Sequence, residues 1–181
     1  TEIYMRAVTE ALKEGQQVLV LVPEIAMTPQ TVRRYMARYP NQVGLYHSQL
    51  SEGERYDTWR RVYSQDLQLI VGPRSALFLP YQSLKLIVID ECDHDSFDEQ
   101  EREPFYHTVE TAIAYCQKLE ARLIMGSATP RVTQYYQAQR GHWFLVELPN
   151  RVYLRNPQDP GTVQQLELPP VRVVDMRAEL R

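Results

Sequence analysis

Residues 84–95 read LKLIVIDECDHD, an apolar run that ends abruptly in acidic residues. The run at 86–89 is rich in β-branched residues, which is typical of a strand buried on both faces of a parallel sheet. Asp90 and Glu91 follow it without a spacer. At the carboxyl end of such a strand, two acids point to the rim where open α/β sheets bind ligands. One carboxylate can hold a hydrated Mg²⁺ and the other can orient a water, as phosphoryl transfer requires. The same pattern also fits a strand end that is merely solvated by acids.

Apolar runs and helical patterns alternate along the rest of the chain. Strands are predicted at 18–22, 43–46, 67–71, 122–125 and 143–146, and helices at 1–14, 28–39, 51–64, 108–118 and 130–140. Thr28 before a proline predicts a helix start, and Ser51 with Glu54 three residues later predicts a capping box. Short connections between apolar strands and helices indicate a doubly wound, mainly parallel α/β sheet with helices on both faces.

The composition fits one domain of ordinary size and limits the kinds of partner. With 44% hydrophobic and 24% charged residues over 181 positions, the chain can bury a core. Its net charge of −3 excludes a general basic field, so a nucleic acid would need a local patch. No apolar run approaches the ~20 residues of a membrane span and no signal peptide is visible, so we expect a cytoplasmic protein without a membrane partner. The two cysteines, Cys92 and Cys116, lack zinc-site spacing, and we expect no zinc in this segment.

The amino-acid composition of the chain changes near residue 149. Residues 149–170 are rich in proline and poor in apolar residues, which indicates an irregular connector, and 171–174 form one more candidate strand. We therefore expect a domain over 1–148, followed by a connector and strand over 149–181. The chain begins at Thr1 within a helical pattern, so it looks cut from a longer protein.

Polar loops directly follow five of the predicted strands. They contain Pro23-Glu24, His47-Ser48, Gly72-Pro73-Arg74-Ser75, Asp90-Glu91 and Ser127-Ala128-Thr129. Because the carboxyl ends of parallel strands meet at one rim, these loops should lie together. One surface is then expected to collect carboxylates, hydroxyls, an arginine and a histidine.

Six strings in a fixed order carry a resemblance to a known family. They are VLVLVPEIAMTPQT, LYHSQLSEGER, IVGPRSALFLP, LIVIDECDHDSF, MGSATP and VRVVDMR. In this order they resemble the first motor lobe of the PriA family of superfamily 2 DNA helicases. The resemblance covers nearly the whole chain. It implies a RecA-like fold, ATP and Mg²⁺ as cofactors, and 3′-to-5′ helicase activity of the intact protein in replication restart and primosome assembly. The implied partners are single-stranded and branched DNA, replication-restart proteins and a second helicase lobe of the same chain.

The resemblance also assigns roles around the acidic pair. Asp90 would hold Mg²⁺ through water, and Glu91 would position the attacking water. Thr1 matches the last residue of the family's phosphate loop, so it would bind ATP and Mg²⁺ in the intact protein. Motif III, which links the nucleotide state to the grip on DNA, is matched by Ser127, Ala128 and Thr129.

Contacts to single-stranded DNA are implied for the loops and helix starts. The expected contact residues are Glu24, Thr28, Gln30, His47, Ser48, Arg74, Ser75, Phe105, Tyr106 and His107. Helix N-termini and hydroxyl groups can donate hydrogen bonds to the DNA phosphates. The aromatic rings of the loop after the acidic pair, which also contains Phe97, can stack on bases without reading the base sequence.

Plainer interpretations of these residues stay open. Arg74 could be a structural salt-bridge partner, His47 and Ser48 a turn pair, and His107 only a polar helix start. The acidic run at 93–103 would repel phosphate unless it faces away or meets a partner.

Two departures from the family pattern bear on function. The glycines and lysine of the Gly-Ser-Gly-Lys-Thr phosphate loop are absent, as is the strand before them, which is expected in the middle of the sheet. The 181 residues alone are therefore expected neither to bind ATP tightly nor to hydrolyse it. The family string DEEHD reads DECDHD here, so either Asp93 or His94 could take the fourth position, and we assign His94 to the catalytic set. Two other functions stay open: a DNA- or protein-binding module without hydrolysis, and another superfamily 2 DNA translocase.

Overall fold

A parallel sheet of five strands forms the centre of the first of two compact units. In the computed structural model, which describes residues 2–100, 103–148, 151–153 and 164–166, the units are Thr1–Gln134 and Tyr135–Arg181. The sheet contains β1 (Gln17–Leu21), β2 (Val43–Leu45), β3 (Leu69–Gly72), β4 (Leu84–Asp90) and β7 (Arg122–Gly126), in the order β2-β3-β1-β4-β7. Every neighbouring pair is parallel, which confirms the predicted α/β class.

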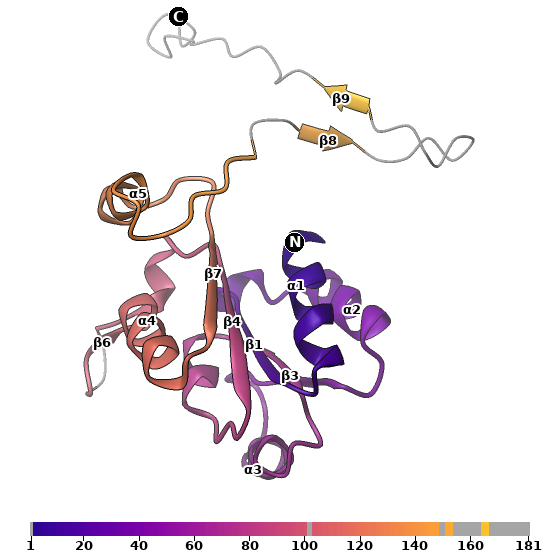
Figure 1. Ribbon diagram of the computed structural model, residues 1–181. Coiled ribbons are helices and arrows are strands. Elements are labelled where there is room, and N and C mark those ends of the chain that lie inside the picture. Colours follow the sequence, from indigo (N-terminus) through magenta and orange to yellow (C-terminus); the bar gives the residue numbers. More distant parts are fainter. Residues whose placement is uncertain (1, 101–102, 149–150, 154–163, 167–181) are drawn as a thin grey trace, which may run out of the picture. The chain divides into compact units, whose positions relative to one another are not determined.

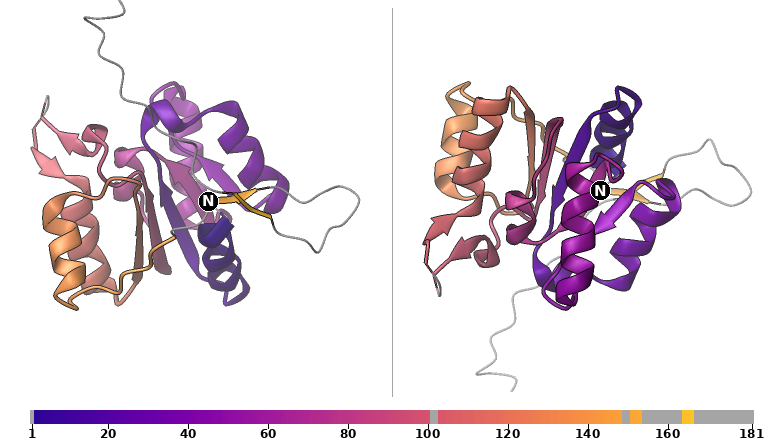
Figure 2. Two further views of the ribbon diagram at one scale, coloured as in Figure 1. Left: turned by 90° about the horizontal axis from the view of Figure 1, so that it is seen from above. Right: turned by 90° about the horizontal axis from the view of Figure 1, so that it is seen from below.

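Helices cover both faces of this sheet (Figures 1 and 2). They are α1 (Glu2–Lys13), α2 (Pro29–Arg38), α3 (Glu52–Tyr63) and α4 (Thr108–Leu119). A further helix, α5 (Val132–Gln139), spans the boundary between the units. Three short 3₁₀ helices, η1 (Glu24–Ala26), η2 (Arg74–Phe78) and η3 (Asp95–Phe97), follow strands or lie in the loop after β4. A two-stranded hairpin of β5 (Asp98–Glu99) and β6 (Tyr106–His107) precedes α4.

Strand β1 shows why the central strands are apolar throughout. All of its residues are buried, and alternate side chains enter different core clusters. Val18 packs in the cluster that contains Val8 of α1, whereas Leu19 packs in the cluster that contains Val109 of α4. The α1 and α2 side and the α4 side of the sheet therefore each have a core, as expected for a doubly wound fold.

The predicted helix starts at Thr28 and Ser51 are confirmed. The Thr28 side chain accepts a hydrogen bond from the Thr31 backbone at the start of α2. Ser51 and Glu54 form the predicted capping box at the start of α3. The hydrogen bonds from the Ser51 side chain and backbone lower the pKa of Glu54 below its ordinary value.

One expectation about strands was wrong. Residues 143–146 form no strand, and Phe144 is 94% exposed, because a lone apolar run cannot form a strand without a neighbour to pair with. Within the described sheet, β1 pairs directly with both β3 and β4. Among the described residues β7 pairs with β4 alone, and its side chains are less buried than those of β1.

The second unit contains the end of α5 and an antiparallel strand pair. Arg140 lies over the Tyr136 ring, with its guanidinium carbon 5.2 Å from the ring centroid. Strands β8 (Arg151–Tyr153) and β9 (Gln164–Leu166) pair within the segment that was expected to be irregular, so that expectation was wrong for these residues. The strand predicted at 171–174 lies outside the described residues. In the part of the chain that the structure describes, every helix is too short or too polar to cross a membrane.

Candidate functional site

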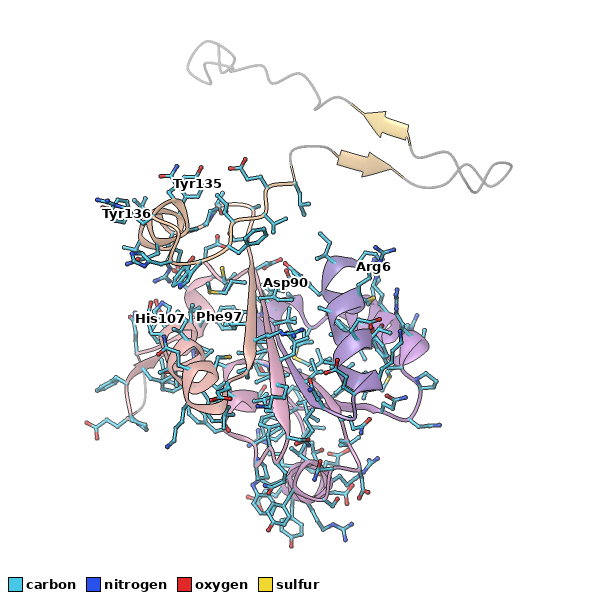
Figure 3. The ribbon with its side chains drawn as sticks, in the orientation of Figure 1. Arg6, Asp90, Phe97, His107, Tyr135 and Tyr136 are labelled. Atoms are coloured by element: carbon cyan, nitrogen blue, oxygen red, sulfur yellow. The ribbon has the colours of Figure 1, made fainter. Side chains whose placement is uncertain are left out.

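The polar loops expected at one rim begin at the same edge of the sheet. The register pairs Leu21 with Gly72 on one side and with Ile89 on the other, and Asp90 with Gly126. The loops after β1, β3, β4 and β7 therefore leave the sheet at the same level, and β2, parallel to β3, delivers its loop there too. Figure 3 shows Asp90 at this end of β4.

Asp90 ends β4 and lies beside a tyrosine from α1. Burial, followed by the charge of Asp90, raises the pKa of the Tyr4 hydroxyl above its ordinary value. A Cβ atom at Gly126 would lie 1.5 Å from that hydroxyl oxygen, so only glycine leaves room for Tyr4 at the end of β7. The sequence analysis missed Tyr4, and the available signal was a glycine at the end of the strand after the acidic pair.

Glu91 marks the turn out of the sheet. It is exposed and has a left-handed backbone, with φ of 53°, which costs a non-glycine residue roughly 1–2 kcal/mol. The next residue returns to the sheet, since the Cys92 backbone donates to the Gly126 carbonyl over 3.0 Å. The Cys92 side chain is buried, and burial followed by the charge of Asp93 raises its pKa to about 11. An exposed carboxylate on a strained backbone fits a residue placed for function rather than for stability.

Asp93 joins the acidic box, which we define as residues 90–95 after β4, to the Ser127-Ala128-Thr129 segment after β7 that matches motif III. Its two carboxylate oxygens accept hydrogen bonds from the Ser127 hydroxyl at 2.5 Å and the Thr129 hydroxyl at 2.8 Å. The Ser127 hydroxyl in turn accepts from the Thr129 backbone at 2.9 Å. The hydrogen bond from Ser127, ahead of that from Thr129, lowers the pKa of Asp93. The carboxylate therefore stays ionised at neutral pH and holds both ends of the motif, while Ala128 between them is exposed.

His94, which was assigned to the catalytic set, makes different contacts. Its Nδ1 accepts from the Ser96 backbone at 3.0 Å, and the residue caps η3. Of the two residues that the sequence left open for the fourth position of the box, the geometry favours Asp93.

Arg74, an expected DNA contact, is bound within the protein. Its guanidinium donates to the Ser96 carbonyl at 2.8 Å, the Asp98 carbonyl at 3.1 Å and the Glu99 carboxylate at 2.7 Å. These contacts fit the plainer interpretation of Arg74 as a structural partner of the loop after β4. The neighbouring Ser75, also an expected contact, is exposed.

The acidic run finds further partners on the other side. Asp98 lies 3.2 Å from Arg131 and 2.9 Å from His107 Nε2. His107 is thus more than a polar helix start, although it also caps α4. Arg131 and Asp98 were absent from the predicted site. The available signal was an arginine two residues after Thr129, in a chain whose acidic loop needed a partner of opposite charge.

The aromatic residues of this loop differ in accessibility. Phe105 is 62% exposed, whereas Phe97 is 0% exposed and belongs to the core. The expectation that Phe97 could stack on a base was therefore wrong, because η3 turns it inward. Tyr106 packs edge to face on Phe78, with ring centroids 5.1 Å apart. In Figure 3, Phe97 and His107 lie on the α4 side of the sheet.

The loops after β1 and β2 touch each other. The Ser48 hydroxyl donates to the Glu24 carboxylate of η1, so two expected DNA contacts are neighbours. Thr28 caps α2, Gln30 is exposed in its first turn, and the His47 carbonyl accepts from the Leu50 backbone. Thr1 lies outside the described residues.

Magnesium would fit this edge through few protein ligands. Within residues 2–100, 103–148, 151–153 and 164–166, no group of three His, Cys, Asp or Glu side chains is arranged to hold a metal. Mg²⁺ usually keeps several waters and takes one or two carboxylates together with substrate phosphates. Asp90, partly buried at the strand end, suits such a site.

Comparison with known proteins identifies the family. The DEAD/DEAH box helicase family matches residues 1–137. The replication restart protein PriA of Bacillus subtilis is 42% identical over 181 residues, 100% of this chain and 21% of that protein. PriA of Synechocystis is 43% identical over 100% of this chain and 21% of that protein. PriA of Haemophilus influenzae is 42% identical over 79% of this chain and 20% of that protein. The chain spans about a fifth of these relatives' length. It belongs to the DEAD/DEAH box helicase family and resembles PriA over its whole length.

Proposed function

We propose that the chain is part of the motor of an ATP-dependent 3′-to-5′ DNA helicase that acts in replication restart and primosome assembly in the cytoplasm. Residues 1–148 would form the first motor lobe and 149–181 the connector toward a second lobe. The identity to PriA proteins and the helicase family support this. The single observation that carries it is Asp93, which ties the acidic box after β4 to motif III after β7.

The acidic pair would carry the chemistry. Asp90 would hold Mg²⁺ that arrives with ATP, and the ion would neutralise charge on the phosphate oxygens. Glu91 is exposed at the edge immediately beyond Asp90, where its carboxylate can orient a water and take up its proton. Tyr4 limits the space beside Asp90, because its hydroxyl lies over Gly126.

Motif III would couple the nucleotide state of the site to the strength of DNA binding. The ionised Asp93 holds Ser127 and Thr129, so a shift of the box after β4 moves motif III with it. A second lobe that closes over ATP could drive this shift, as in other enzymes whose domains close over a ligand.

DNA would lie across the loops at the same edge. The start of α2, capped by Thr28, presents backbone N–H groups that suit phosphate. Phe105 is exposed and can stack on a base. Glu24 and Ser48 would contact the strand as a joined pair, while Arg74 would support the loop from within.

A strand-displacement assay on the full-length protein tests this function. Forked duplexes with only a 3′ or only a 5′ single-stranded arm are offered with ATP, with a non-hydrolysable analogue, or without nucleotide. The expected result is displacement that requires ATP and the 3′-to-5′ direction. Binding without displacement under all conditions would favour a non-hydrolysing module, and ATP turnover without displacement would favour another superfamily 2 translocase.

The 181 residues on their own should not turn over ATP. The sequence contains no Gly-x-x-x-x-Gly-Lys-Ser/Thr loop to cradle the phosphates. Phosphate release by the purified 181-residue chain above the rate of a Glu91→Gln control would contradict this.

A further inference from the structure

The carboxylate of Asp90 faces the α1 and α2 side of the sheet. Along β4, Ile89 packs in the core cluster on the α4 side, and Val88 packs in the cluster on the α1 and α2 side. Side chains alternate between the two faces of a strand, so Asp90, two positions after Val88, points to the same side as Val88. It is only partly buried at this end of the strand. Asp90 therefore lies between the core under α1 and the edge where the loops begin.

Gly126 leaves a space beside this carboxylate. The register pairs Gly126 of β7 with Asp90 of β4. Ile124, two positions before Gly126, packs against the same core cluster as Val88. A side chain at position 126 would therefore point to the α1 and α2 side, next to that of Asp90. Glycine has no such side chain, so the position is open to a group from another element.

The Tyr4 hydroxyl occupies that position. A Cβ atom at Gly126 would lie 1.5 Å from the Tyr4 hydroxyl oxygen, so the hydroxyl stands almost where a methyl group would be. Neighbouring strands are about 4.8 Å apart, which brings the hydroxyl within reach of the Asp90 side chain. Burial, the charge of Asp90 and a hydrogen bond with the Asp90 side chain, in that order, raise the pKa of Tyr4 above its ordinary value. An ionised carboxylate can only accept hydrogen bonds, so the phenol is the donor.

The contact joins two parts of the proposed nucleotide site. Tyr4 lies in the first turn of α1, three positions after Thr1, which is expected to end the phosphate loop. A carboxylate has two oxygens, and a phenol that donates to one of them fixes the orientation of the group. Hydrogen bonds of this kind orient the residues that hold a metal and tune their affinity for it. The second oxygen is then left for a water of Mg²⁺.

We propose that Tyr4 is a positioning residue that holds the Asp90 carboxylate in the orientation needed for magnesium, and that Gly126 is required because it admits the phenol. This rests on the proposed role of Asp90. Tyr4 acts through Asp90 and touches neither the nucleotide nor the metal ion. Its loss should therefore weaken the part of ATP binding that depends on magnesium.

The test measures binding and needs no turnover. The affinity of the full-length protein for a fluorescent ATP analogue is measured with saturating Mg²⁺ and in EDTA, and the ratio of the two affinities is the magnesium effect. Tyr4→Phe keeps the ring and removes only the hydroxyl, and it should lower the magnesium effect about tenfold, with the affinity in EDTA within about twofold of the wild type. Gly126→Ala, which displaces the hydroxyl without changing Tyr4, should lower it in the same direction.

Tyr39→Phe is the matched control. Tyr39 is buried in the same core cluster, and its hydroxyl donates to the Met5 carbonyl of α1 and contacts Thr9. Its removal loosens the contact between α1 and α2 without removing a partner of Asp90. It should lower the Tm but keep the magnesium effect within about twofold of the wild type.

Two results would overturn the proposal. One is a magnesium effect in Tyr4→Phe within about twofold of the wild type. The other is an equal fall of the magnesium effect in Tyr39→Phe and Tyr4→Phe, which would show that a loosened α1 is the cause and not the lost hydroxyl. A wild type that binds the analogue equally well with and without Mg²⁺ would instead remove the proposed role of Asp90, and this inference with it.

Discussion

Substitution of Gly126 by alanine tests how tightly α1 closes the site edge. The new Cβ would lie 1.5 Å from the Tyr4 hydroxyl oxygen and 2.6 Å from the ring carbon that carries it, whereas ordinary contact begins at 3.4 Å. The hydroxyl must therefore retreat by about 2 Å from the end of β7 to reach ordinary contact. Overpacking of this kind typically costs about 1–3 kcal/mol, and we expect the free energy of unfolding to fall by that amount.

A double-mutant cycle assigns the loss to this clash. Tyr4→Ala alone removes a partly buried ring and should also destabilise the chain, by about 2–4 kcal/mol. In Tyr4→Ala/Gly126→Ala the new methyl group has room, so the double variant should be more stable than the sum of the two single effects by at least about 1 kcal/mol.

Urea unfolding of the 181-residue chain, followed by circular dichroism, gives these free energies. Gly53→Ala is the matched control: it lies in the first turn of α3, and a Cβ there meets nothing within 4 Å. It should be neutral or stabilise by up to about 1 kcal/mol. If Gly126→Ala behaved like Gly53→Ala, or if the cycle were additive, Tyr4 would not lie where the structure has it.

Further expectations concern Asp93, the thiols and Arg74. Asp93→Asn should destabilise the chain by about 1 kcal/mol at pH 7. The hydrogen bond from Ser127 lowers the pKa of Asp93 below its ordinary 3.8. The difference in free energy of unfolding between the wild type and Asp93→Asn should therefore be complete above pH 3.8 and shrink as the pH falls below it. Equal differences at pH 7 and pH 3 in urea unfolding would contradict this expectation. Burial raises the pKa of Cys92 and Cys116 to about 11. At pH 8 both thiols should therefore react with Ellman's reagent at least about a hundredfold more slowly in the native than in the unfolded chain. Similar reaction rates in the two states would refute their burial. Arg74→Ala should destabilise the chain by about 1–3 kcal/mol, because its three acceptors lose their donor. It should leave the salt dependence of single-stranded DNA binding by the full-length protein unchanged. A slope of log affinity against log salt concentration that was lower by about one would mean that Arg74 contacts phosphate.

Local rules predicted most of the fold. The apolar run before Asp90 became the buried strand β4, and Thr28 and Ser51 start helices as their side-chain chemistry requires. These features depend on residues close in sequence. The strand predicted at 143–146 failed because a strand needs a neighbour, which propensity alone does not supply.

The contacts within the site depended on features that sequence patterns do not contain. Asp93, not His94, contacts Ser127 and Thr129 two residues after the left-handed turn at Glu91, and a positive φ in a glutamate has no local sequence signal. Arg74 finds its acceptors 22 to 25 positions away, and Arg131 lies 33 positions from Asp98. Such partners become visible only when the loops are brought together by the sheet.

Glu91→Gln in the full-length protein tests most directly whether the acids at the sheet edge carry out the chemistry. Steady-state ATPase with saturating single-stranded DNA is compared with ATP affinity measured by a fluorescent analogue. We expect turnover to fall at least about a hundredfold, near 2.7 kcal/mol of barrier, because a general base is lost. ATP affinity should stay within about threefold, since glutamine keeps the shape of the side chain and the proposed role of Glu91 is toward the attacking water, not the bound phosphates. Turnover that persisted within about tenfold of the wild type would show that Glu91 does not activate the water.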